Sequence, residues 1–140
     1  MVDEREFPQT FGKYTLLAKL GHGGMAEVFL ALLTGPGGFR KLVVVKRTHM
    51  HLLDEEGFVD MFLDEARLAA RLAHPNVVQT HEVDVEAGRP YLAMEYLEGQ
   101  PLNRILGRLR REGRRLPYPM LAHLFLGVLD GLHYAHTLKD

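Results

Sequence analysis

The spacing of apolar residues along the chain alternates between the two-residue period of a strand and the longer period of a helix. Short runs rich in β-branched and aromatic residues predict five strands, at residues 14–20, 27–33, 41–47, 77–85 and 91–97. Glycine-containing turns separate them, namely Gly21 to Ala26, Thr34 to Gly38, and Ala87-Gly88. The pattern therefore predicts a sheet built largely from neighbouring strands.

Three other segments have helical spacing. The first covers residues 55–73 and ends at His74-Pro75-Asn76, because the residue before a proline is pushed out of the α region. Two more, at 102–111 and 119–138, follow Gly99 and are separated by Gly113 and Pro117. Strands followed by helices predict an α+β fold rather than alternating βαβ units.

Two charged residues occur at apolar positions of this pattern. Lys46 closes the apolar run of the strand 41–47, where alternation predicts apolar side chains on both faces. Glu65 falls within the stripe of the first helix formed by Phe58, Phe62, Ala69 and Leu72. A carboxylate facing a core is costly unless it is paired, so we expect Lys46 and Glu65 to pair. The remaining charged residues of the helix, Asp60, Asp64, Arg67 and Arg71, are expected on the surface.

Composition and charge restrict the class of protein. The 140 residues are 46% hydrophobic and 25% charged, as expected of one modest globular domain. A net charge of −1 gives no global attraction to nucleic acid or membranes, and no apolar run is long enough to cross a bilayer. Cysteine is absent, and the acidic start is unlike a signal peptide. We therefore expect a cytoplasmic setting.

The glycine-rich turn Gly21-His22-Gly23-Gly24 is compatible with phosphate binding, because glycines let backbone N–H groups approach phosphate oxygens closely. Taken alone it could equally be an ordinary hairpin loop, or the first turn of a dinucleotide-binding fold. What distinguishes these possibilities is the order of later residues, with Lys46 closing an apolar run, Glu65 in a helix, and Met94-Glu95-Tyr96 in the last strand.

In this order, from Tyr14 to the last residue, the chain resembles the ATP-holding half of a protein kinase, in particular the bacterial eukaryotic-like serine/threonine kinases. The residues Gly21-x-Gly23-x-x-Ala26-x-Val28 and Val43-Val44-Val45-Lys46 are similar to the glycine-rich loop and the lysine strand of that family. His74-Pro75-Asn76 resembles the turn that follows its main helix. Two departures are Ala26 in place of the third glycine and Val44 in place of the usual alanine.

The resemblance implies a small lobe with a five-stranded antiparallel sheet and one main helix at residues 14–97. It would follow an extension at 1–13 and precede the hinge end and first helices of an incomplete helical lobe at 98–140. It implies that the Lys46–Glu65 pair positions the phosphates of ATP. The adenine would be held by apolar side chains and by backbone groups of the hinge. The implied nucleotide contacts are Leu20, Gly21, Gly23, Gly24, Ala26, Val28, Val44, Lys46, Met94 as gatekeeper, Glu95 and Leu97.

The kinase sequences that supply the catalytic base and the Mg²⁺ ligands, His-Arg-Asp and Asp-Phe-Gly, do not occur in these 140 residues. We expect weak ATP binding and no phosphate transfer from the 140 residues alone, with protein Ser/Thr phosphorylation as the function of a full kinase. The alternative is a non-catalytic module that binds nucleotide, or that binds a partner through the broad apolar stripe at residues 121–132.

Two further patterns have less specific interpretations. His49 and His51, or His133 and His136, have spacings found in metal sites, but no acid or cysteine completes a site, and none is predicted. Six arginines, Arg104, Arg108, Arg110, Arg111, Arg114 and Arg115, form a local basic patch. A solvated helix face is the preferred interpretation, and contact with phosphate or an acidic partner is the alternative.

Overall fold

The computed structural model describes residues 7–138, apart from the side chain of His22, and the chain divides into two compact units. The first unit contains the residues up to Ala73 together with Val78–Tyr96. The second contains His74–Val77 and the residues from Leu97 onward. A short internal segment therefore belongs with the C-terminal helices, and each unit is described separately.

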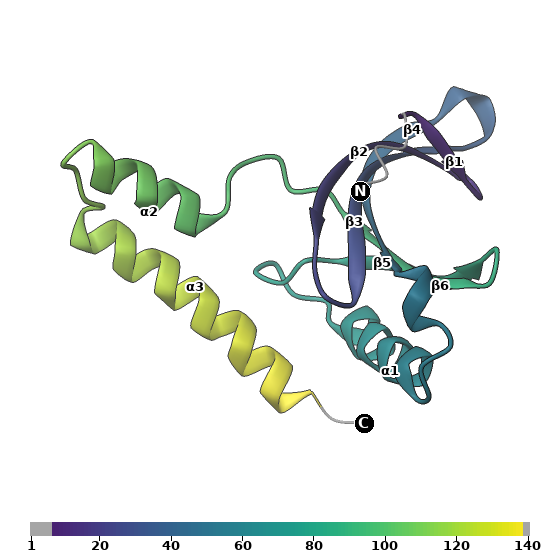
Figure 1. Cartoon of the computed structure of the whole chain (residues 1–140). Coiled ribbons are helices and arrows are strands. Elements are labelled where there is room, and N and C mark those ends of the chain that lie inside the picture. The colour runs from purple at the N-terminus through teal and green to yellow at the C-terminus, as the bar shows by residue number, and fades with distance from the viewer. Residues whose placement is uncertain (1–6, 139–140) are drawn as a thin grey trace. The chain divides into compact units, whose positions relative to one another are not determined.

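The first unit is built on a six-stranded antiparallel sheet with the strand order β1-β2-β3-β4-β6-β5 (Figure 1). The strands are β1 Gln9–Phe11, β2 Tyr14–His22, β3 Ala26–Thr34, β4 Arg40–Thr48, β5 Thr80–Glu86 and β6 Arg89–Glu95. All five strands predicted from the alternation are present, with boundaries shifted by up to three residues. The sixth strand, β1, was not predicted, and its pairing with β2 brings part of the expected N-terminal extension into the sheet.

The turns between strands follow the predicted glycine positions. A short 3₁₀ helix at Pro36–Gly38 joins β3 to β4, and Gly37 and Gly38 there have positive φ angles of 69° and 78°. Ala87 and Gly88 join β5 to β6 with φ angles of 49° and 74°. Positive φ at both central residues is the conformation of the type I′ turn that suits a two-residue hairpin.

One face of the sheet is covered by a cluster of aromatic and aliphatic side chains. The cluster consists of Phe11, Tyr14, Leu16, Phe29, Ala31, Val43, Val45, Tyr91 and Ala93, with Phe7 and Leu33 at its edge. The rings of Phe11 and Tyr14 both meet the ring of Tyr91 edge to face. This cluster is the main core of the unit, and it explains why the odd-numbered apolar residues of β4 are fully buried.

The opposite face of the sheet packs against helix α1, Phe58–Arg71 (Figure 1). Phe62 and Ala66 of the helix contact Ala26 of β3 and Leu92 of β6. The predicted helix was three residues longer at its start and two longer at its end. The charged residues expected on its surface, Asp60, Asp64, Arg67 and Arg71, are all exposed.

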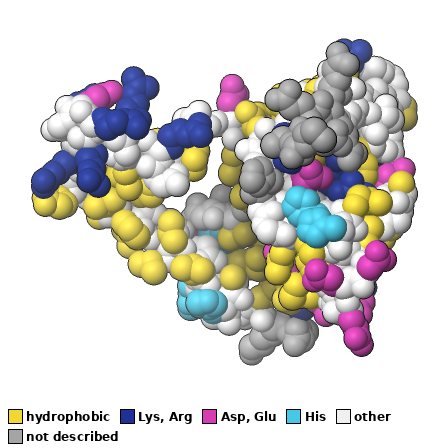
Figure 2. Space-filling model, in the orientation of Figure 1, with side chains coloured by type: hydrophobic (Ala, Val, Ile, Leu, Met, Phe, Trp, Pro, Cys, Tyr) yellow, Lys and Arg dark blue, Asp and Glu magenta, His cyan; other side chains and the backbone are white. Residues whose placement is uncertain are grey.

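The second unit contains helices α2, Leu102–Arg111, and α3, Tyr118–Thr137, and both agree with the prediction to within one residue. The structure describes both helices over their full length. Along that length α2 has no buried residue, and the buried residue of α3 is Gly131. Apolar side chains of α3 such as Leu124, Val128 and Leu132 are exposed. Figure 2 shows hydrophobic surface along this helix. The apolar stripe predicted at residues 121–132 is thus largely open.

The segment His74–Val77 is held by α3. The His74 Nε2 atom lies 3.2 Å from a carboxylate oxygen of Asp130, and its ring lies over that of Tyr134 with centroids 5.2 Å apart. Asn76 donates its backbone N–H to His74 Nδ1 at 3.0 Å, so the hydrogen on the neutral ring is on Nε2 and points at Asp130. Gly131 lets α3 approach the segment 74–77 closely, because a Cβ at this position would lie 3.2 Å from the Asn76 carbonyl oxygen.

None of the helices within residues 7–138 combines the length and the apolar composition needed to cross a bilayer.

Candidate functional site

The residues predicted to hold a nucleotide in the first unit lie in two rows across the central strands. Val28 on β3 is paired with Lys46 on β4, which is paired with Leu92 on β6. The next row places Leu30 beside Val44, and Val44 beside Met94. Directly paired residues of antiparallel strands project to the same face of a sheet. Val28, Val44, Lys46 and Met94 therefore share one face.

Lys46 and Glu65 are paired on that face, as the sequence predicts. The Lys46 Nζ lies 3.3 Å from a carboxylate oxygen of Glu65 on α1. The Lys46 side chain is 30% exposed and that of Glu65 is 61% exposed. A contact at this distance and exposure orients the ammonium group while leaving part of its surface open to a further anionic ligand.

The environment of Glu65 differs from the expectation that it faces the core. Helix α1 packs through Phe58, Phe62 and Ala66, which are spaced by four residues, and Glu65 lies at the edge of that stripe. The carboxylate is therefore largely solvated. Burial was the wrong reason for the pairing, since the ion pair forms at the margin of the interface between the helix and the sheet.

The glycine turn between β2 and β3 is closed by a hydrogen bond from the Gly23 backbone N–H to the Ala26 carbonyl at 2.9 Å. Gly21 and Gly24 border open space, since a Cβ built on either would meet no other atom within 4 Å. The backbone there has room for a bulky ligand. The surroundings of this turn thus fit a phosphate group, which backbone N–H groups of such turns bind.

His49 supports the same turn and was not predicted to do so. Its ring Nε2 donates to the Gly23 carbonyl oxygen at 2.9 Å, and its backbone N–H donates to the Met25 carbonyl at 3.3 Å. The ring is stacked on that of His51 with centroids 5.2 Å apart. Within residues 7–138 there is no group of three or more His, Cys, Asp or Glu side chains arranged to hold a metal ion.

Two of the predicted contact residues differ in their accessibility. Ala26 is 3% exposed, packs against α1 and accepts the Gly23 N–H with its carbonyl, so neither its side chain nor its backbone is open to a ligand. Leu20 lies in an irregular part of β2, where the register with β3 shifts, and half of its surface is exposed. A leucine at this edge of the sheet is free to cover a planar ligand.

A charged cluster lies just beyond the glycine turn and was missed by the sequence analysis. Glu27 on β3 accepts hydrogen bonds from Lys19 at 2.9 Å, Arg47 at 3.4 Å and Arg89 at 3.2 Å. Burial raises the pKa of the Glu27 carboxyl, but the hydrogen bonds from Lys19 and Arg89 and the charge of Arg47 outweigh it and bring the pKa to about 2. The carboxylate is therefore ionised at neutral pH and links its own strand, β3, to β2, β4 and β6 beside the turn.

The two arginines of this cluster are buried and have further partners. Arg47 lies over the ring of Phe29, with its guanidinium carbon 4.5 Å from the ring centroid. Arg89 donates to the backbone carbonyl of Thr48 as well as to Glu27. In the sequence these arginines follow Lys46 and Gly88 with no pattern that distinguishes them from surface residues. Only the register of β3, β4 and β6 brings them together.

The predicted hinge residues belong to both units. Glu95, the last residue of β6, is tied to Gln79 by two hydrogen bonds, one from its backbone N–H at 2.9 Å and one to its side chain at 2.8 Å. Leu97, the other predicted backbone contact, belongs to the second unit and is exposed. The structure therefore gathers Lys46, Val28, Val44, Met94, Glu95 and the glycine turn in one unit, and the part that these residues and Leu97 would play in nucleotide binding stays a prediction.

Comparisons with known proteins point in one direction. The sequence profile of the protein kinase domain matches residues 14–139. The chain is 46% identical over 94% of its length to the tyrosine-protein kinase MasK of Myxococcus xanthus. It is 34% identical over 91% of its length to the serine/threonine-protein kinase PksC of Streptomyces coelicolor. Those matches cover 20% and 23% of the two relatives, so the chain spans about a fifth of their length.

Solved structures give the same result. The crystal structure of the Mycobacterium tuberculosis PknI kinase domain superimposes with a TM-score of 0.70 at 28% identity. That match covers 92% of this chain and 50% of the PknI chain. The predicted α+β fold, an antiparallel sheet with one main helix followed by two more helices, is confirmed by this similarity and by the topology, with six strands in place of the five predicted.

Proposed function

Because the chain belongs to the protein kinase family, we propose that its first unit is the ATP-binding part of a kinase that transfers the γ-phosphate of ATP to a protein hydroxyl. The chain covers half of the PknI kinase domain, and the proposal for phosphate transfer therefore concerns a full kinase domain. Since ATP is the phosphate donor, we also propose a cytoplasmic location for this unit.

The observation that carries the proposal is the Lys46–Glu65 ion pair on the same sheet face as Val28, Val44 and Met94. A lysine oriented by a carboxylate supplies a fixed positive charge for the α- and β-phosphates. On the same face Val28 and Met94 are partly exposed and offer apolar contacts for a purine ring, whereas Val44 is buried, and the open glycine turn leaves space for the phosphates. These groups form one side of a nucleotide site.

We propose that the 140 residues alone bind ATP weakly and do not transfer phosphate. Neither His-Arg-Asp nor Asp-Phe-Gly occurs in them, and these sequences provide the base and the Mg²⁺-binding side chains of kinases. Mg²⁺ would be held by those residues in a full domain. Incubation with radiolabelled ATP, Mg²⁺ and a general protein substrate tests this, and incorporation above that of a heat-denatured sample would contradict it.

The experiment that tests nucleotide binding is titration calorimetry with ATP, with and without Mg²⁺, on the 140-residue protein and on the Lys46→Ala variant. We expect the variant to weaken ATP binding about tenfold, because a charge-assisted contact to a phosphate is lost. Lys41→Ala is the matched control, since this lysine lies on the same strand and is exposed near His81.

The two possible failures have different meanings. If Lys41→Ala weakens binding as much as Lys46→Ala does, the contact is not specific to the proposed site. If the folded protein shows no ATP binding at all, the first unit does not form a nucleotide half-site alone. Circular dichroism of each variant establishes that it is folded before the titration is interpreted.

The acceptor residue in a full kinase is proposed to be serine or threonine. PksC and several other relatives are named serine/threonine kinases, whereas MasK is named a tyrosine kinase. Phosphoamino-acid analysis of the products of a kinase domain that carries this chain tests the proposal. Phosphotyrosine as the main product would overturn it.

The alternative function is a non-catalytic module that binds a nucleotide or a partner. A nucleotide-binding module would use the same site at Lys46. A partner-binding module would use the exposed apolar face of α3, and this exposure is the observation that favours the alternative. We prefer the kinase, since the chain belongs to the protein kinase family. Phosphate transfer by a full domain distinguishes the two functions.

A further inference from the structure

The surface of the second unit that carries most charge lies along α2 and the turn that follows it. Residues 100–115 contain six arginines and one acidic residue, Glu112, although the whole chain has a net charge of −1. Figure 2 shows the Lys and Arg side chains gathered over α2. The remainder of the chain is therefore acidic on balance, and the positive charge of this helix is a local property.

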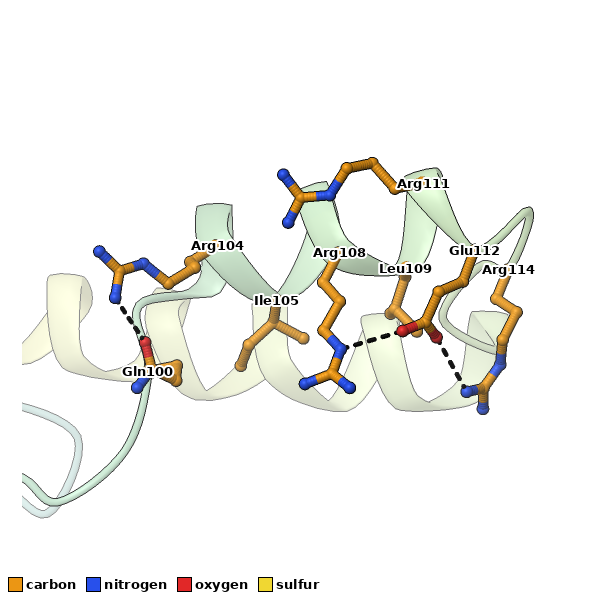
Figure 3. Close-up of a pocket in the computed structure, with 8 residues that line it drawn as sticks. All are labelled: Gln100, Arg104, Ile105, Arg108, Leu109, Arg111, Glu112 and Arg114. Carbon is orange, nitrogen blue, oxygen red and sulfur yellow. Dashed lines mark hydrogen bonds and ion pairs between the residues drawn. The ribbon is translucent and has the colours of Figure 1, made fainter.

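Four of these arginines, Arg104, Arg108, Arg111 and Arg114, line a groove (Figure 3). The groove has a cavity volume of about 500 Å³, and its lining includes Ile105 and Leu109 beside Arg104, Arg108 and Arg114. Figure 3 shows Ile105, Arg108 and Leu109 on the same side of α2, with Arg111 projecting away from them. A row of cationic groups thus runs beside two apolar side chains.

Side-chain contacts hold these arginines along the groove. Arg104 donates to the side-chain oxygen of Gln100 at 3.0 Å. Glu112 accepts from Arg108 at 2.9 Å and from Arg114 at 3.4 Å. Glu112 is a single acid between two arginines, so positive charge remains in excess. The Arg108 and Arg114 side chains are more than 70% exposed, which leaves their other N–H donors open to a ligand.

We propose that this groove docks an acidic segment of another protein, with Asp or Glu carboxylates on Arg104, Arg108 and Arg114 and an apolar side chain on Ile105 and Leu109. Arginine matches the geometry of carboxylates through paired N–H groups. An apolar floor and the carboxylate of Glu112 favour a ligand that mixes apolar and acidic groups over a uniform polyanion such as nucleic acid. The proposal involves no residue of the nucleotide site and does not depend on ATP binding.

The test uses fluorescence anisotropy with the 140-residue protein and a short labelled peptide in which glutamates alternate with leucines. We expect saturable binding at low salt that weakens as salt rises, since the contacts are exposed ion pairs. The Arg104→Gln/Arg108→Gln variant should weaken binding about tenfold, because each exposed ion pair contributes a few-fold in affinity. Ile105→Ser should also weaken it, with no change in charge.

The controls separate this docking site from general attraction between opposite charges. Arg67→Gln/Arg71→Gln removes the same charge from two exposed positions of α1, and we expect it to change the affinity by less than twofold. A peptide with glutamine in place of glutamate should not bind.

Three results would overturn the proposal. They are equal losses in the α1 and α2 variants, tighter binding of a single-stranded oligonucleotide or of anionic lipid vesicles than of the peptide, and the absence of saturable binding. Helix content measured by circular dichroism should be unchanged in all the variants, because the substituted side chains are exposed.

Discussion

The two units bury their side chains in different ways. The sheet of the first unit buries side chains on both faces, in an aromatic cluster on one and against α1 over part of the other, and its buried arginines are paired with Glu27. In the second unit α2 has no buried residue along its described length, and Gly131 is the buried residue of α3. The first unit therefore contains its own core, whereas the second exposes most of the apolar surface of its helices.

The largest expected difference between the units is in core packing. Phe62→Ala should lower the free energy of unfolding by about 3–5 kcal/mol, because it leaves a cavity between α1 and the sheet. Phe125→Ala removes the same ring from α3, where it is 54% exposed, and should cost less than about 1 kcal/mol. Urea unfolding followed by circular dichroism measures both, and equal effects would contradict the comparison.

The next effect concerns the buried charges of the first unit. Glu27→Gln should cost about 3 kcal/mol, because Arg47 and Arg89 stay buried without their carboxylate. Urea unfolding at neutral pH measures it, and Glu56→Gln, which changes an exposed residue, is the control. A loss no larger than that of the control would show that the cluster does not stabilise the sheet.

The same cluster predicts a dependence on pH. The pKa of Glu27 in the folded protein is about 2, below its ordinary value of 4.5. A lowered pKa stabilises the folded state fully above the ordinary value, and the stabilisation is lost as pH falls from about 4.5 towards 2. The difference in unfolding free energy between wild type and Glu27→Gln should therefore shrink over this range. A difference independent of pH would contradict the assignment.

A smaller effect is expected in the second unit. His74→Ala removes the contacts of the His74 ring to Asp130 and Tyr134, and should destabilise the packing of residues 74–77 on α3 by about 1 kcal/mol. Hydrogen exchange of the α3 amides near Gly131 should become faster. His136→Ala, a change at an exposed position of the same helix, is the control. Equal exchange rates in wild type and His74→Ala would contradict the prediction.

The smallest effect tests the glycine turn. His49→Ala removes the hydrogen bond to the Gly23 carbonyl, worth about 1 kcal/mol, and should accelerate hydrogen exchange of the Gly23 amide. His51→Ala leaves that bond in place and should have little effect. If both variants exchange alike, the ring stacking rather than the hydrogen bond holds the turn.

Much of the fold could be predicted from local patterns in the sequence. Alternation and glycine turns predicted five strands, because each strand of this sheet has a buried face and a short connection to a neighbour. β1 was missed, since three residues are too few to show a period. The anchoring of His74 on α3 was missed because its partners are more than fifty residues away in sequence.

The candidate site was also predictable in part from local patterns in the sequence. Lys46 and Glu65 stood out as charges among apolar residues, although Glu65 proved to be at the edge of the helix stripe. Ala26 looked like a turn residue, but its side chain fills the contact between β3 and α1. Glu27, Arg47 and His49 act through pairing across strands and turns, which no local pattern shows.

The assignment of His74–Val77 to the second unit has a consequence for dissecting this protein. The polypeptide passes from one unit to the other three times, after Ala73, after Val77 and after Tyr96. A single cut in the gene at the last of these junctions would therefore not yield two intact pieces. The N-terminal piece would retain residue 74 without the helix that receives it, and a clean separation would require a short designed connector in place of residues 74–77.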